Sequence, residues 1–290
     1  MRGKRRWWVG PVRSIVLAYL GVAIFLATIQ AQLIFPGAAT QGRPESAVAP
    51  PRDCDLVRLP TAAGDEVVAL FGPALTPEGG PRGDAATCPT ILYFYGNAMC
   101  LNAALPEFDQ FRRLGANVLI PDYLGYGMSG GTASELACRA TAEAALAHLR
   151  SRPDVDPGRI VAAGWSLGGA VAIDLAARQP VAGVVSFCTF TRMADMARRL
   201  VPFLPTSLLP RHRFDNEAKV AGLTIPILIG HGRRDRIIPF AMADRLAQVA
   251  PGPVARVTID EADHNDFFAV DPATIDRALQ QFITNLPRQP

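Results

Sequence analysis

A serine between two glycines is the residue of this sequence best suited to covalent chemistry. The stretch Gly164-Trp165-Ser166-Leu167-Gly168 is a complete G-x-S-x-G. The apolar run from Arg159 to Ala163 before it predicts a buried strand, and the small residues from Leu167 to Arg178 after it predict a helix. Glycines lack Cβ, so the strand and helix can pack closely around a tight turn that exposes the serine hydroxyl. We therefore predict Ser166 as a nucleophile, with a purely structural turn as the alternative.

A serine hydroxyl is barely ionised at neutral pH, so this chemistry needs a base, and histidine usually supplies it. His264 lies between the last predicted strand and the last predicted helix, where a parallel sheet brings a loop to its carboxyl edge beside Ser166. The remaining histidines have other expected roles. His148 lies near a helix C-terminus and favours that end of the helix dipole, His212 lies in a solvated loop, and His231 ends a strand and shapes the loop that follows. We predict His264 as the base, and a surface turn is the alternative.

The base in turn needs a carboxylate to hold its tautomer. Asp235 follows the penultimate predicted strand and so lies at the same edge of the sheet. Asp195, after the strand that ends at Phe187, is the second candidate. Asp263 and Asp266 are too close to His264 in sequence, and we expect them to cap a helix. The predicted set is Ser166, Asp235 and His264, in that chain order.

Strands that alternate with helices must position these residues. The predicted strands are Asp55 to Pro60, Glu66 to Phe71, Thr90 to Tyr95, Asn117 to Pro121, Arg159 to Ala163, Val181 to Phe187, Ile225 to Gly230 and Val254 to Ile259. The predicted helices are Leu101 to Leu114, Ser134 to Arg150, Leu167 to Arg178, Pro239 to Val249 and Thr274 to Asn285. This alternation, opened by a hairpin, predicts an α/β fold with a mostly parallel sheet and helices on both faces. There is no internal repeat.

The N-terminal region has the pattern of a membrane signal. Residues 1–13 form a basic leader, and residues 14–35 are uncharged and mostly apolar, about 33 Å long as a helix against about 30 Å of bilayer hydrocarbon. The positive-inside bias predicts a single-pass signal anchor with a cytoplasmic N-terminus and an extracytoplasmic catalytic domain, which is periplasmic in a bacterium. A cleaved signal peptide, with a weak site at Ile29-Gln30-Ala31, is the alternative, and it also exports the domain. We expect a linker over residues 36–54 and a catalytic domain over residues 55–290, with a cap at 189–224.

Charge and cysteine usage exclude several classes of function. Five of the 29 Lys and Arg residues lie in the leader, which leaves 24 against 26 Asp and Glu. A nucleic-acid binder would carry its basic surface on the folded domain, so we expect no nucleic-acid partner. The five cysteines have no C-x-x-C spacing and the histidines are scattered, so we expect no metal and no organic cofactor. In an exported domain a disulfide is permitted, and the odd count leaves at least one thiol unpaired.

Five motifs in order resemble those of the α/β-hydrolase superfamily, over about Asp55 to Asn285. They are most similar to its membrane-anchored group with lysophospholipase-like and acyl-protein-thioesterase-like members. The matching pieces are Tyr95-Gly96-Asn97-Ala98, the run from Asp122 to Gly130 (DYLGYGMSG, similar to the group's D-Y-x-G-Y-G-x-S-x-G), the G-x-S-x-G itself, His231-Gly232-x-x-Asp235 with Pro239, and His264-Asn265-Asp266. The sequence departs from that group at Tyr95, where the group has histidine, and at Met99, where glycine is common.

The resemblance implies an α/β-hydrolase fold and further site residues. It places the backbone N–H groups of Leu167 and Asn97 in an oxyanion hole, with Ala98 as the alternative donor, and it implies substrate contacts from Tyr95, Ala98 and Trp165. Because the donors are backbone groups, we expect Tyr95 to change the shape of the loop more than the hole itself.

We therefore expect a membrane-tethered serine hydrolase that cleaves carboxylic esters or thioesters through an acyl-enzyme. A serine peptidase or amidase of the same fold and a catalytically silent binding protein are the alternatives. The predicted cap is apolar in part and has a local charge of +3, from six basic residues against three acidic ones. If it faces the bilayer, the substrate is a small-molecule or lipid ester with one acyl chain; an ordinary solvated cap helix is the alternative.

Overall fold

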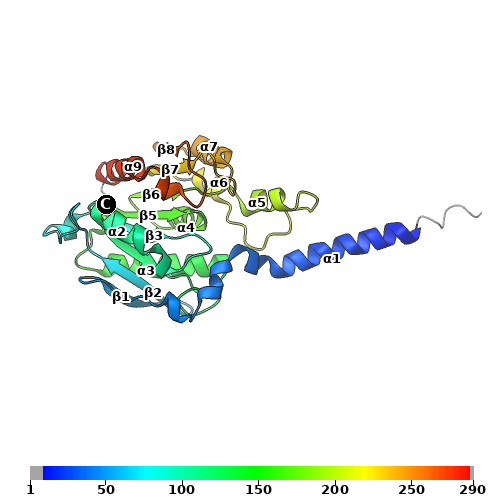
Figure 1. The fold of residues 1–290 in the computed structure, drawn as a ribbon, viewed down its shortest axis with the longest axis horizontal. Coiled ribbons are helices and arrows are strands. Elements are labelled where there is room, and N and C mark those ends of the chain that lie inside the picture. The colour runs from blue at the N-terminus through cyan, green and yellow to red at the C-terminus, as the bar shows by residue number, and fades with distance from the viewer. Residues whose placement is uncertain (1–8, 288–290) are drawn as a thin grey trace, which may run out of the picture.

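The computed structural model describes residues 9–287, which form an eight-stranded sheet between two layers of helices, with one long helix projecting from the domain (Figure 1). The strand order is β1-β2-β4-β3-β5-β6-β7-β8, and strands β3 to β8 run parallel. The hairpin of β1 and β2 joins antiparallel to β4 at one edge. The strands are β1 (Asp55–Pro60), β2 (Glu66–Gly72), β3 (Thr90–Phe94), β4 (Asn117–Pro121), β5 (Ile160–Trp165), β6 (Gly183–Phe187), β7 (Ile227–Gly232) and β8 (Val254–Ile259).

The central strands are apolar throughout because both faces of the sheet are covered. Every residue of β3, β4, β6 and β7 is buried. A strand with two covered faces has no polar face, so its sequence shows a continuous apolar run rather than alternation. Each strand and helix predicted from the sequence is present, with bounds shifted by a few residues, and the α/β-hydrolase fold is confirmed.

The helices pack in two layers. On one face α2 contacts α9 through Gln110 Nε2 and Asp276 Oδ1, 2.6 Å apart. On the other face α3, α4, α6 and α7 form a continuous row of neighbours. The helices are α1 (Val9–Ile34), α2 (Leu105–Arg113), α3 (Glu135–Ser151), α4 (Leu167–Ala176), α5 (Met193–Leu200), α6 (Asn216–Val220), α7 (Phe240–Val249), α8 (Phe267–Val270) and α9 (Pro272–Thr284).

Helix α1 extends away from the domain (Figure 1). By length and composition its stretch from Gly10 to Ile34 can cross a membrane, and its most apolar window is not buried inside the protein. The helix covers most of the stretch predicted as an anchor. Residues 1–8, which carry most of the predicted basic leader, lie outside the described residues.

The segment expected to be a linker is packed against the domain instead. The segment begins after buried Phe35 and contains two 3₁₀ helices, Pro36–Thr40, in which Gly37 is buried, and Pro44–Ser46. Gly37 N donates to Asn97 O (2.9 Å) and Gly42 N donates to Gly127 O (2.8 Å). Residues 36–48 are therefore not a free spacer, because apolar side chains and backbone hydrogen bonds hold them to the loops that follow β3 and β4.

The predicted cap divides into two parts. Helix α6 packs between α4 and α7 and so belongs to the helical layer that covers the sheet. Helix α5 and residues 201–211 lie outside this layer, on the side of the domain from which α1 projects (Figure 1). Met193 and Met196 on α5 pack against the core, whereas Arg198 and Arg199 are exposed. From here on "the cap" means residues 193–211.

Candidate active site

Ser166 occupies a strained turn between β5 and α4. Its backbone angles are φ 58° and ψ −117°, and its N–H donates to Phe187 O at 2.8 Å. A non-glycine residue at such a positive φ costs about 1–3 kcal/mol and persists only where its surroundings enforce it. Both motif glycines are required: a Cβ on Gly164 would lie 2.1 Å from the carbonyl carbon of Gly168, and a Cβ on Gly168 would lie 1.8 Å from Phe94 O.

The structure brings the three predicted residues together. His264 Nε2 lies 3.0 Å from Ser166 Oγ, and His264 Nδ1 lies 2.7 Å from Asp235 Oδ2. All three side chains are buried. Since an ionised carboxylate only accepts hydrogen bonds, Nδ1 carries the proton and Nε2 presents a lone pair to the serine hydroxyl.

The environment of Asp235 keeps it ionised. Burial alone would raise the pKa of this carboxyl, but hydrogen bonds from His231 and His264 hold it well below its usual range. The backbone N–H groups of Ile237 (2.9 Å) and Ile238 (2.7 Å) also donate to Oδ1. The carboxylate therefore stabilises positive charge on His264 at any neutral pH.

His231 contacts the carboxylate of Asp235 in addition to the loop that the sequence predicts it to shape. Its Nε2 lies 3.2 Å from Asp235 Oδ2 and 2.9 Å from Ile238 O. It does shape the loop after β7, as expected, but it also contacts the carboxylate. The feature of the sequence that could have indicated this contact is the position of His231, which lies in β7 only four residues before Asp235.

The other candidates lie elsewhere. Asp195 accepts hydrogen bonds from Thr191 Oγ1 (2.8 Å) and Arg192 Nε (3.1 Å), so its carboxylate is engaged at the start of the cap. His212 is not a solvated loop residue: its ring packs against Phe35, with 5.0 Å between centroids. Half-buried His148 lies in the last turn of α3.

The two acidic neighbours of His264 shape its loop rather than cap a helix. Asp263 Oδ1 accepts the N–H of His264 at 2.7 Å, and Asp266 Oδ1 accepts the N–H of Asp263 at 2.7 Å. Asp266 precedes α8, but its side chain forms no capping hydrogen bond.

Leu167 and Asn97, which the resemblance places in an oxyanion hole, both line the cavity next to Ser166. Leu167 is the first residue of α4, where backbone N–H groups have no partner within the helix. Asn97 lies in the loop after β3, and its carbonyl accepts hydrogen bonds from Gly37 N and Tyr126 Oη, both at 2.9 Å. Its side-chain amide donates to Ile34 O at 3.1 Å, at the end of α1.

The expected substrate contact of Tyr95 is wrong. The ring is fully buried, and its hydroxyl donates to Asp122 Oδ1 at 2.7 Å. Asp122 also accepts the N–H groups of Leu101 (2.7 Å) and Met128 (2.8 Å), although burial raises the pKa of this carboxyl. Tyr95 therefore braces the loop after β3 against the loop after β4. A Cβ on Gly127 would lie 2.2 Å from Asp122 Oδ2, so this position also needs glycine.

Ala98 and Trp165, the other two expected substrate contacts, line the cavity. The Trp165 ring lies against the imidazole of His264, with 4.9 Å between centroids. Ala98 lies in the loop after β3, next to Asn97.

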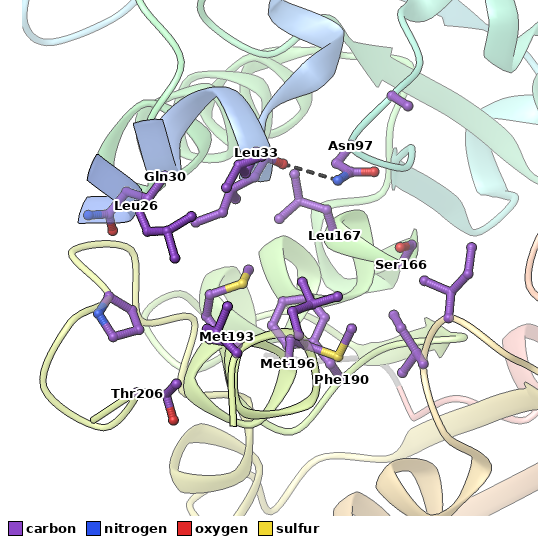
Figure 2. A pocket seen from close by; sticks show the side chains of 18 of the residues that line it. Leu26, Gln30, Leu33, Asn97, Ser166, Leu167, Phe190, Met193, Met196 and Thr206 are labelled. Carbon is purple, nitrogen blue, oxygen red and sulfur yellow. Dashed lines mark hydrogen bonds between the residues drawn. The ribbon is translucent and has the colours of Figure 1, made fainter. Parts of the chain in front are cut away.

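The cavity in front of Ser166 has a volume of about 730 Å³ and mostly apolar walls. Figure 2 shows Leu26, Gln30 and Leu33 of α1 on one side, Met193 and Met196 of the cap on the other, and Ser166 at one end. The contribution of α1 was not predicted, because nothing in a run of apolar residues tells whether lipid or another part of the chain will cover it.

Metal ligation fits the site poorly. Atoms of Cys188, Asp235 and His264 lie within 4.8 Å of one another. However, the two imidazole nitrogens are engaged with Asp235 and Ser166, and burial raises the pKa of the Cys188 thiol, which disfavours the thiolate that a metal needs. All five cysteines are free.

Comparison with known proteins agrees with this fold. The model of the alpha/beta hydrolase family matches residues 93–221. The uncharacterized protein Rv2307c of Mycobacterium tuberculosis is 32% identical over 276 residues, which cover 94% of each chain. Among solved structures, an esterase of Pyrococcus furiosus superposes with a TM-score of 0.64 at 18% identity, over 82% of this chain and 97% of the esterase. A puromycin-hydrolyzing peptidase of M. tuberculosis gives 0.65 at 20% identity, over 84% of this chain and 41% of the peptidase. The family model, the sheet order and the relationship to Rv2307c together show that the chain belongs to the α/β-hydrolase family.

Proposed function

We propose that this protein is a membrane-tethered serine hydrolase that cleaves carboxylic ester or thioester bonds in substrates with an acyl chain. The observation that carries the proposal is the hydrogen-bonded chain from Asp235 through His264 to Ser166, which ends at an apolar cavity. A histidine that accepts from a serine hydroxyl and donates to a buried carboxylate makes that hydroxyl nucleophilic toward a carbonyl. Acyl transfer is therefore the reaction that this geometry supports best.

In the first half of the reaction, Ser166 Oγ bonds to the substrate carbonyl carbon while its proton passes to His264 Nε2. Asp235 stabilises the imidazolium, which then gives the same proton to the departing alcohol or thiol. In the second half, a water molecule gives a proton to His264 and attacks the acyl carbon. The bond between this carbon and Ser166 Oγ then breaks, and His264 passes the proton to Oγ, so the acid leaves and the serine hydroxyl is restored.

The backbone N–H groups of Leu167 and Asn97 are the proposed donors to the oxyanion. Support comes from their position beside Ser166 and from the first turn of α4, because the N-terminal end of a helix favours negative charge. Each such donor acts on charge that develops only in the transition state, and the loss of one typically costs about 3 kcal/mol.

An acyl chain is the substrate part that matches the cavity. Met193, Met196 and Phe190 offer it apolar surface, and Trp165 and Ala98 lie near the reacting atoms. Because each buried methylene is worth about 0.8 kcal/mol, a cavity of this kind favours an extended hydrocarbon over a small acetyl group.

The membrane tether is α1. Its length and apolar composition support the proposal, as does the excess of Lys and Arg before it in the sequence. By the positive-inside rule the N-terminus lies in the cytoplasm and the catalytic domain on the other side, in the periplasm of a bacterium.

The test is Ser166→Ala in the full-length protein in detergent micelles. We expect hydrolysis of p-nitrophenyl butyrate to fall by at least about 10⁴-fold and labelling by a fluorophosphonate probe to disappear. The temperature of thermal unfolding should not decrease, because the substitution leaves the glycines of the turn in place. Wild-type protein that neither reacts with the probe nor cleaves esters would disprove the proposal and favour a silent binding protein.

A further inference from the structure

Helix α1 and the cap form the two long walls of the cavity. Leu26, Ala27 and Leu33 line it from α1, and Ala197 and Leu200 line it from the cap. Figure 2 shows the space between these two walls leading to Ser166. A helix with the composition of a membrane span therefore forms part of the substrate site.

The two walls are joined on either side of this stretch of α1. Tyr19 Oη donates to Phe203 O at 3.1 Å, and the Arg211 N–H donates to Gln30 Oε1 at 2.7 Å. Leu26 and Ala27 lie on α1 between these two attachments. The attachments hold the cap beside α1 and frame an opening between the two walls.

The rim of this opening is apolar and exposed. Leu200, which lines the cavity, is 80% exposed, and Phe203 and Leu208 in the cap are 61% and 82% exposed. Large apolar side chains gathered on one face mark a surface that another apolar medium covers. Exposed Arg198 and Arg199 precede Leu200, where they can reach anionic lipid headgroups.

The composition of α1 indicates which part of the helix the bilayer hydrocarbon covers. The uncharged stretch of the helix begins at Ser14, after Arg13, and its 20 residues to Leu33 are about 30 Å long, which matches the roughly 30 Å of bilayer hydrocarbon. Tyr19, Leu26 and Ala27 lie within this stretch, and glutamines at positions 30 and 32 lie near its end on the side of the domain. The opening between the attachments at Tyr19 and Gln30 therefore faces the hydrocarbon.

We propose that the opening between α1 and the cap is a portal through which the acyl chain of a membrane-resident ester or thioester passes directly from the bilayer to Ser166. The inference rests on the proposed function and deepens it: it names the substrate as a lipid-like acyl compound of the leaflet next to the domain. The chain stays in apolar surroundings throughout, and only the ester head crosses the polar surface to reach the serine.

The experiment uses the full-length protein reconstituted in lipid vesicles, with p-nitrophenyl palmitate as the membrane-resident probe and p-nitrophenyl butyrate as the soluble one. The palmitate ester is supplied either in the same vesicles as the protein or in separate vesicles. We expect at least tenfold faster hydrolysis from the same vesicles, because the portal opens only to the bilayer that holds α1.

Ala27→Phe narrows the portal, and Ala18→Phe is the matched control on an exposed part of the same helix that does not line the cavity. The quantity measured is the ratio of kcat/KM for palmitate to that for butyrate. We expect Ala27→Phe to lower this ratio at least tenfold and Ala18→Phe to leave it unchanged.

Equal rates from the same and separate vesicles would show that the substrate arrives through water and would overturn the portal. Faster hydrolysis from the same vesicles, together with a wild-type palmitate-to-butyrate ratio in Ala27→Phe, would show that the substrate does not pass between α1 and the cap, and would overturn the portal. If the palmitate-to-butyrate ratio falls equally in both variants, the effect belongs to helix α1 as a whole, and this result would also overturn the portal. Wild-type protein that cleaves neither ester and does not react with a fluorophosphonate would instead refute the proposed function, and the portal with it.

Discussion

Gly37 connects the end of α1 to the loop of Asn97, and its replacement by alanine should impair catalysis from outside the triad. A Cβ at this position would lie 2.2 Å from Tyr126 Cε1, 2.7 Å from Met99 O and 2.8 Å from Asn97 O. The buried Tyr126 ring packs edge-on against Tyr123, with 5.4 Å between centroids, so it has little room to turn away. The loop must therefore move by about 1 Å, and a misplacement of that size costs about 100-fold in rate.

The assay is kcat/KM for p-nitrophenyl butyrate in detergent micelles, together with the thermal unfolding transition. We expect Gly37→Ala to lose about 100-fold in kcat/KM and about 1–3 kcal/mol of stability, the usual cost of overpacking. Gly83→Ala is the matched control, because nothing lies within 4 Å of the added Cβ. A folded Gly37→Ala protein with wild-type kcat/KM would refute the reasoning that this contact positions the Asn97 loop for catalysis.

Two further predictions concern carboxylates. Asp235→Asn should lower kcat about 10⁴-fold, because an amide no longer holds the reactive tautomer of the imidazole, whereas Asp195→Asn should keep a kcat near that of wild type. The reverse result in the ester assay would assign the role of the acid to Asp195. Burial alone would raise the pKa of Asp174, but hydrogen bonds from Arg139 and Lys219 outweigh burial and lower the pKa below the usual 3.8. The ionised carboxylate therefore stabilises the fold fully above pH 3.8, and this stabilisation is lost as the pH falls through the lowered pKa. Urea unfolding should show Asp174→Asn about 1–3 kcal/mol less stable than wild type at neutral pH and the gap closing in acid, and a gap that persists at low pH would contradict this assignment.

The triad could be predicted because its positions follow from local rules. The turn at Ser166 needs glycines on both sides, and this requirement is visible within five residues of sequence. Asp235 and His264 each follow a strand of a parallel sheet, so the fold itself brings their loops to one edge. The structure added the distances and the second histidine, His231, on the carboxylate.

The errors concern contacts between segments far apart in the chain. Tyr95 was assigned to the substrate because its position in the motif adjoins the oxyanion loop, but its hydroxyl is used by Asp122, 27 residues away. Residues 36–54 were predicted as a linker because they are rich in Gly, Ala and Pro, but Gly37 fits closely against the domain and Gly42 N donates to Gly127 O. Neither composition nor periodicity reports which surface a short irregular segment will cover.

The packing of α1 also bears on the choice between an anchor and a cleaved signal peptide. Cleavage after Ala31 would remove Leu26, Ala27 and Gln30 from the wall of the cavity and break the hydrogen bond from Arg211 N to Gln30 Oε1. The facing apolar side chains of the cap would then lie open to water, at a cost of about 25 cal/mol for each Å² exposed. A signal sequence has no reason to complete a substrate site in the mature protein, whereas an anchor that stays attached can serve as tether and wall together. The architecture of the cavity therefore favours the uncleaved anchor.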